Sequence, residues 1–94
     1  MENINSAKIS GVISDIRHSQ NNTYFVSLKQ QVLYNNELHP ITFEVAIFPE
    51  HQEIIDKLQM NATVIFEGTI TVFKLRKYGI YKQVINASKI EIIK

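Results

Sequence analysis

The sequence predicts an all-β protein, a small closed barrel of five strands with one short α-helix between strands 3 and 4. Five segments alternate apolar and polar residues, which is the pattern of strands that bury one face. One segment, 49–58, has its apolar residues at helical spacing instead. Gly68 interrupts the fourth strand, and a glycine inside a strand marks the bend that a small barrel needs to close. The 94 residues suffice for a single domain, 1–94, with a modest core.

The first strand carries Ile9, Gly11 and Ile13 on one face, and Ile16 extends that face beyond an irregularity. A polar turn at 20–22 ends it. The second strand begins at Tyr24. We expect its inward residues to be Tyr24, Val26 and Leu28, and its outward residues to be Phe25, Ser27 and Lys29.

A polar connection at 34–40 then forms a hairpin to the third strand. In the third strand, the inward set is Phe43, Val45 and Ile47, and the outward set is Thr42, Glu44, Ala46 and Phe48. Because side chains alternate with a period of two, a slip of one residue would bury Phe25 and Phe48 instead.

Pro49 ends the third strand and opens the helix, which is expected to run to Leu58. Asn61 is expected to take the left-handed conformation that closes a helix. The fourth strand spans Thr63 to about Lys74, and the fifth runs from Ile80 to Ile93. This order is that of the OB-fold barrel. The expected core residues are Val26, Leu28, Phe43, Val45, Ile47, Val64, Phe66, Ile70 and Ile85.

The composition excludes several classes of protein. There is no cysteine, so disulfides and thiolate sites are absent, and the three histidines stand apart without carboxylates at ligand-like spacing. Neither a catalytic triad nor a phosphate-cradling glycine loop is present, and Glu67 has no second carboxylate at a matching position. We therefore expect no enzyme, metal or cofactor. Without a secretion signal or an apolar run of about 20 residues, the protein is expected to be cytoplasmic.

Charge is distributed unevenly along the chain. The formal net charge is only +1, yet the stretch 68–90 contains no acidic residue. Its basic residues are Lys74, Arg76, Lys77, Lys82 and Lys89. Positive potential is therefore expected at the hairpin between the last two strands.

Aromatic rings are interleaved with these cations. Rings that stack on bases, beside cations that pair with phosphates, are what a single-stranded nucleic-acid site requires. We expect the site residues to be Phe25, Lys29, Phe48, Phe73, Lys74, Arg76, Lys77, Tyr78, Tyr81 and Lys82. Tyr78 and Tyr81 have a second interpretation, as a cap on the barrel end or a subunit contact. Val72 and Phe73 are adjacent in the fourth strand and point to opposite faces, so one of the two must face the core.

The chain resembles the bacterial single-stranded DNA-binding proteins and the related primosomal replication protein, from about Ile4 to Ile93. The best anchor is the segment 64–70, Val-Ile-Phe-Glu-Gly-Thr-Ile, which fits the family's apolar-x-apolar-Glu-Gly-x-apolar strand. Segments 9–13, 42–48, 54–58 and 85–90 fit in order and spacing. The resemblance implies binding of single-stranded DNA and self-association, with Phe48 where the family places a stacking ring.

The chain also departs from that family. Asn61 stands where the family usually has glycine, and there is no tryptophan to stack on bases. Lys94 follows the last strand directly, without the family's long acidic-tipped tail. A tail-less relative encoded by a phage or mobile element, or an accessory subunit of a replication enzyme, is the expectation.

Two functions follow from the sequence. The first is a single-stranded nucleic-acid-binding module in DNA replication or recombination, with RNA not excluded as ligand. The second is an OB-fold subunit that docks on a polymerase, primase or helicase through protein contacts, for which Phe25, Phe48 and Leu75 offer apolar surface.

Overall fold

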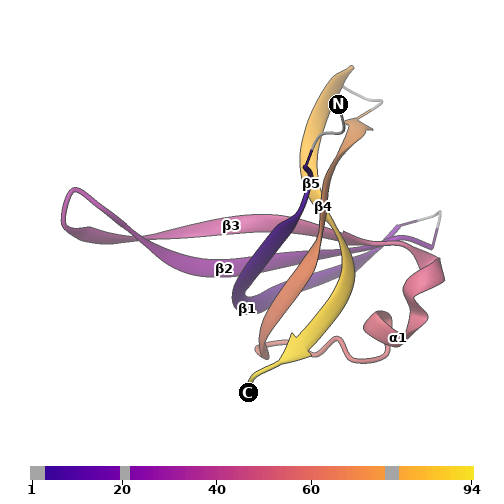
Figure 1. The fold of residues 1–94 in the computed structure, drawn as a ribbon, viewed down its shortest axis with the longest axis horizontal. Coiled ribbons are helices and arrows are strands. Elements are labelled where there is room, and N and C mark those ends of the chain that lie inside the picture. Colours follow the sequence, from indigo (N-terminus) through magenta and orange to yellow (C-terminus); the bar gives the residue numbers. More distant parts are fainter. Residues whose placement is uncertain (1–3, 20–21, 76–78) are drawn as a thin grey trace.

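The computed structural model describes residues 4–19, 22–75 and 79–94. In this part of the chain five strands close into a barrel in the order β1-β2-β3-β5-β4 (Figure 1). Their bounds are β1 Ala7–His18, β2 Tyr24–Tyr34, β3 Glu37–Ile47, β4 Thr63–Leu75 and β5 Ile80–Ile92. One helical segment lies between β3 and β4. The predicted OB-fold barrel is confirmed.

Strand β1 pairs with two neighbouring strands. Its first half, Ala7 to Val12, pairs with β4, and its second half, up to His18, pairs with β2. The register with β2 shifts between Ile13 and Asp15, at the irregularity that the sequence predicts. A second shift, between Glu67 and Gly68, lets β4 bend along β5. These two bends allow five strands to close a barrel.

A short seam completes the barrel. β3 and β5 run parallel and pair only at Val45 with Ile85 and at Ala46 with Asn86 in the described residues. All other strand pairs are antiparallel. Beyond the seam the two hairpins separate and project from the barrel as arms (Figure 1).

The β2–β3 arm is longer than the predicted 34–40 connection allows. Pairing continues to Tyr34 opposite Glu37, so the turn consists of two residues, Asn35 and Asn36, with φ of 50° and 62°. Two residues with positive φ form the turn type that matches the twist of a hairpin, and asparagine tolerates this conformation. Pro40 therefore lies within β3, opposite Gln31.

The helical segment is shorter than predicted. A 3-10 turn, Pro49–His51, leads into α1, Gln52–Ile55. The next amides, of Lys57 and Leu58, donate to carbonyls three residues back, so the helix ends in tight turns. Asn61 is left-handed as expected, with φ of 68°, but it lies six residues beyond the helix. Its N–H donates to the Ile13 carbonyl at 2.9 Å, which directs the chain into β4.

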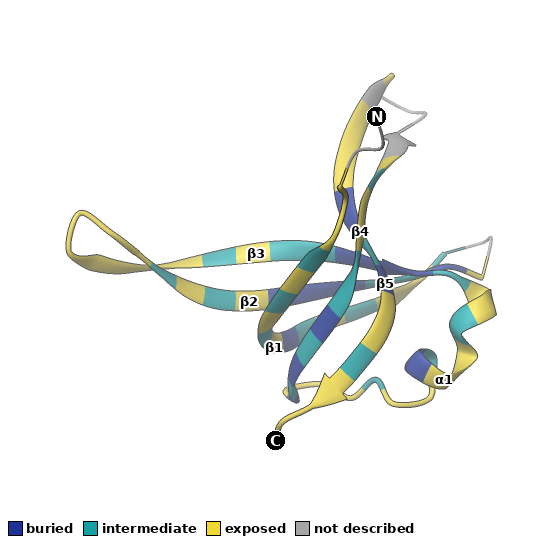
Figure 2. Ribbon diagram, viewed as in Figure 1, coloured by how far each residue is buried: buried dark blue, intermediate teal, exposed yellow. Residues whose placement is uncertain are grey.

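The core fills the barrel where the five strands meet, and the arms are largely exposed (Figure 2). Seven of the nine predicted core residues are buried, namely Val26, Leu28, Val45, Ile47, Val64, Phe66 and Ile85. Phe43 is only half-buried and Ile70 is 49% exposed, so both predictions are wrong. Both residues keep the inward alternation, but they lie where the arms have left the barrel. Further buried hydrophobic residues are Ile13, Ala46, Ile54, Ala62, Val84 and Ala87.

Ala46 and Val72 also differ from expectation. Ala46 points outward as its register requires, yet it is fully buried, because the seam places it between Phe25 and Asn86 of the neighbouring strands. Val72 is 55% exposed on the β4–β5 arm and is not a core residue.

Truncating a side chain should cost more folding stability in the barrel core than on an arm. Phe66→Ala should destabilise the domain by roughly 3–5 kcal/mol, because a fully buried ring leaves a cavity. Ile70→Ala is the matched control and should cost less than about 1 kcal/mol, because half of that side chain is already in water. Urea unfolding followed by circular dichroism measures both. Equal losses would contradict the placement of Ile70 on an arm.

Gly68 is required by the close approach of β4 to β5. A Cβ atom at this position would lie 1.9 Å from the Asn86 carbonyl oxygen, which is backbone and cannot swing away. Gly68→Ala should therefore lower the stability by at least about 1–3 kcal/mol. The neighbouring exposed residue gives the control Thr69→Ala, which should melt close to the parent. If Gly68→Ala keeps the parent's melting temperature, then β4 and β5 leave more room at Gly68 than the 1.9 Å approach to the Asn86 carbonyl oxygen implies.

Candidate nucleic-acid interface

The outward residues of β1, β2, β3 and β5 form one continuous surface, here called the outer sheet face. Residues directly opposite in antiparallel strands share a face. On this face Phe25 lies opposite Ala46, Ser27 opposite Glu44, and Lys29 opposite Thr42. The predicted outward register of β2 and β3 is therefore confirmed.

An ion-pair network crosses the outer sheet face. Nη2 of Arg17 in β1 lies 2.5 Å from both carboxylate oxygens of Glu44 in β3. The Ser27 hydroxyl donates to Glu44 at 3.3 Å. Nζ of Lys82 in β5 lies 4.0 Å from the same carboxylate, and Nε of Arg17 lies 3.5 Å from Asp15. Charged side chains of β1, β3 and β5 and a hydroxyl of β2 thus tie four strands together.

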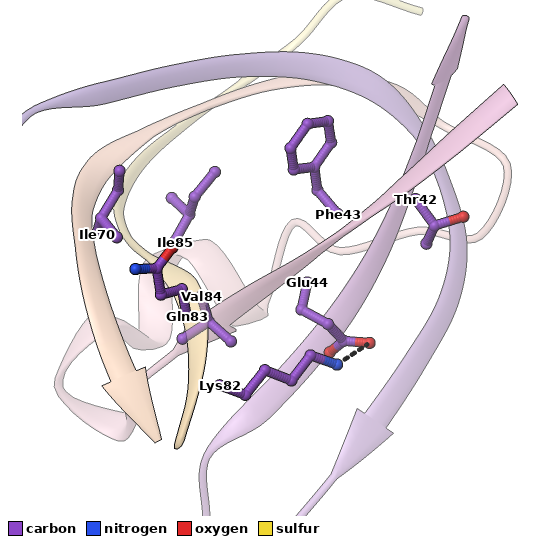
Figure 3. A pocket seen from close by; sticks show the side chains of 8 residues that line it. All are labelled: Thr42, Phe43, Glu44, Ile70, Lys82, Gln83, Val84 and Ile85. Carbon is purple, nitrogen blue, oxygen red and sulfur yellow. Dashed lines mark ion pairs between the residues drawn. The ribbon is translucent and has the colours of Figure 1, made fainter. Parts of the chain in front are cut away.

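A groove of about 460 Å³ opens beyond the seam, where β3 and β5 diverge. It is lined by Thr42, Phe43, Glu44, Ile70, Lys82, Gln83, Val84 and Ile85. Figure 3 shows the Phe43 ring on one side of β3, and Glu44 with its ion-paired Lys82 on the other. An apolar wall and a charged rim therefore share one opening.

Asn5 fixes the β4–β5 arm at the point where it leaves the barrel. Its side-chain Nδ2 donates to the Ile70 carbonyl at 2.9 Å, and its Oδ1 accepts from the Ile70 N–H at 2.8 Å. One amide thus continues the β1–β4 pairing beyond Ala7. Because Ile70 lines the groove, this contact sets one wall of it.

The predicted site residues of the barrel lie on or next to the outer sheet face. Phe25 and Phe48 are half-buried, and Phe48 directly follows the end of β3. Lys29 is exposed on β2. Lys82 joins the Glu44 network, and Tyr81 is 68% exposed on the β4–β5 arm.

The rest of the predicted site belongs to the tip of the β4–β5 arm. The backbones of Phe73 and Lys74 pair with Lys82 and Tyr81 respectively. Arg76, Lys77 and Tyr78 lie outside the described residues. Their assignment to a nucleic-acid site stays a prediction.

Three residues of this region were missed by the sequence analysis. Arg17 lies on β1 beyond Ile16, where the expected strand ended, and its alternation with Asp15 was the available signal. Glu44 was placed outward, but nothing in its own segment pointed to Arg17 or Lys82. Phe43 was assigned to the core and instead lines the groove.

The described residues give no sign of a metal site or a membrane-spanning helix. No group of three or more His, Asp or Glu side chains among them could hold a metal ion. Residues 4–19, 22–75 and 79–94 include no helix with the length and apolar character to cross a membrane. Glu67 forms an exposed ion pair with Lys8 at 3.4 Å.

The contact between Asn5 and the arm predicts a local change in dynamics. Asn5→Ala should speed hydrogen exchange of the Ile70 amide by about fivefold, since a typical hydrogen bond contributes about 1 kcal/mol. NMR-detected exchange measures this, with the Phe66 amide in the barrel as internal control. Unchanged protection of Ile70 would mean that the arm is held in place by β5 alone.

Comparison with known proteins gives structural neighbours. No family model and no curated protein matches the chain. A small single-stranded DNA-binding protein from Mycoplasma pneumoniae superposes with a TM-score of 0.74 at 21% identity, covering 97% of this chain and 93% of that one. A small single-stranded DNA-binding protein from Streptomyces coelicolor gives 0.65 at 17% identity, covering 99% and 96%. The two likenesses extend over nearly the whole length of each protein, and they show that this chain has the same OB-fold.

Proposed function

We propose that this protein is a non-catalytic, single-stranded nucleic-acid-binding protein whose ligand is single-stranded DNA. The observation that carries the proposal is the groove between the two arms, where Phe43 lies across β3 from Lys82. An apolar wall with a ring and a cation at its rim suits bases and phosphates, respectively. The likeness to two small single-stranded DNA-binding proteins over almost the whole chain supports the same function.

Binding begins with electrostatic capture by the cations of the β4–β5 arm, from Lys74 to Lys82. Bases then stack on aromatic rings, with Phe48, Tyr78 and Tyr81 as the candidates. Each stacked base contributes about 1–3 kcal/mol whatever its identity, so the protein should bind with weak sequence preference. A single domain offers few such contacts, so self-association or a larger partner is needed for useful affinity.

The cellular role we propose is DNA replication or recombination in the cytoplasm. The resemblance of the segments 9–13 and 64–70 to single-stranded DNA-binding proteins supports this role. Origin from a phage or mobile element stays a prediction.

A second candidate function is docking on a polymerase, primase or helicase. It is favoured by Leu33 and Leu38, which lie opposite each other on the β2–β3 arm and are 69% and 68% exposed. Such an apolar pair suits a protein contact. The two functions are compatible, because the arms present different surfaces.

The arm tip provides the test. Arg76→Ala with Lys77→Ala should weaken binding to oligo-dT and reduce the salt slope by about one to two units, because fewer counterions are released. Tyr78→Ala with Tyr81→Ala should weaken binding but leave the slope nearly unchanged, because stacking releases no ions. Fluorescence anisotropy across a salt series measures affinity and slope together.

The matched control is Leu33→Ala with Leu38→Ala, on the other arm, which should bind oligo-dT like the parent. If both tip variants bind like the parent, the tip is not the nucleic-acid site. If the parent itself does not bind oligo-dT at low salt, docking on a protein partner becomes the better explanation.

A further inference from the structure

Glu44 is a carboxylate enclosed by cations on the surface that is proposed to bind DNA. Its side chain is only 17% exposed, whereas those of Arg17 and Lys82 are 50% and 51% exposed. Arg17 contacts both of its oxygens, Ser27 donates to one of them, and Lys82 lies 4.0 Å away. Glu44 also lines the groove between the arms. A fixed negative charge thus occupies the wall along which phosphates would pass.

This carboxylate engages Nη2 of Arg17 and offsets the positive charge of the guanidinium. Arginine has five N–H donors, and Arg17 directs Nη2 to Glu44 while its Nε lies 3.5 Å from Asp15. To bind a phosphate through Nη2, Arg17 would have to leave Glu44, whose largely buried charge would then lose its best partner. Exchanging one anion for another brings little net gain in free energy.

Lys82 also attracts a phosphate less strongly than an unpaired lysine would. A phosphate that approaches its ammonium group also approaches Glu44, and repulsion between the two anions offsets part of the attraction. Lys29, on the same face, has no ion pair within 4 Å among the described residues. Of these three described cations of the outer sheet face, only Lys29 is free to meet a phosphate without competition.

We infer that Glu44 is an internal competitor of the DNA backbone, which lowers the affinity of the outer sheet face by holding Arg17 and Lys82 in ion pairs. The inference rests on the proposed function. It assigns to Glu44 a regulating role: DNA is bound weakly enough on this face to be released, and removal of one carboxylate converts the face into a tighter site.

The direct test is Glu44→Gln, which keeps the size of the side chain and its capacity to accept from Ser27. Affinity for oligo-dT at low salt should rise about fivefold, because one nearby anion is removed. The salt slope should steepen by about 0.7 to 1.4 units, since one or two more phosphates are neutralised on a single strand. Glu91→Gln is the matched control: it removes the same charge from an exposed position on β5, nine residues and roughly 30 Å from Lys82, and should bind like the parent.

A double-mutant cycle separates competition from a structural role. Arg17→Gln should change the affinity of the parent less than twofold, but it should remove most of the gain in the Glu44→Gln background. If Glu44→Gln does not fold, as judged by circular dichroism, Glu44→Asp withdraws the carboxylate by one methylene from Arg17 and Lys82 and should raise affinity about twofold. If the network only supports the barrel, changing Glu44 should not raise the affinity, and Arg17→Gln should not cancel any gain.

The outcomes distinguish this inference from the proposed function. Failure of the parent to bind oligo-dT at low salt overturns both. A parent that binds, with a folded Glu44→Gln variant of equal or lower affinity, overturns the inference alone and would mean that Glu44 orients Arg17 toward the phosphate. If Glu44→Gln does not fold, a folded Glu44→Asp variant that binds like the parent has the same meaning.

Discussion

Parallel pairing of β3 with β5 closes the barrel over two residue pairs and then stops. The barrel interior, the groove and the direction of both arms depend on where this pairing ends. Val45 and Ile85 belong to the core, while Phe43 and Ile70, a few residues away on the same inward alternation, line the groove. Close approach of β4 to Asn86 at Gly68 brings β5 to the seam, and a side chain there would push it away. The fold and the candidate site are therefore consequences of one short contact.

Alternation along the strands was sufficient to predict the barrel, because it is a local property of each segment. It gave the five strands, the irregularity near Ile13 and the bend at Gly68. It did not show where a strand leaves the barrel, since an inward residue looks the same in sequence whether the opposite wall is present or not. This explains the errors at Phe43 and Ile70. Ala46 shows the reverse error, because its burial comes from neighbours in two other strands.

The electrostatic potential of the surface was also harder to predict, because it depends on residues in other strands. The stretch 68–90 has no acidic residue, yet Lys82 within it lies beside Glu44, 38 positions earlier in the chain. Arg17, from a third strand, contacts the same carboxylate. The potential of the outer sheet face is thus set by cross-strand neighbours, and counting charges along the sequence overstates how many cations are available.

Pro40 has a consequence for how molecules of this protein meet one another. Counting alternate pairs from the two-residue turn at Asn35 and Asn36 puts Pro40 in a non-hydrogen-bonded pair, with its nitrogen toward the free edge of β3. That nitrogen carries no hydrogen, so the edge lacks a donor near its middle. A strand from a second molecule would find an interrupted template and would add to this edge less readily. One proline thus makes the β3 edge of this extended hairpin a poorer template for edge-to-edge aggregation.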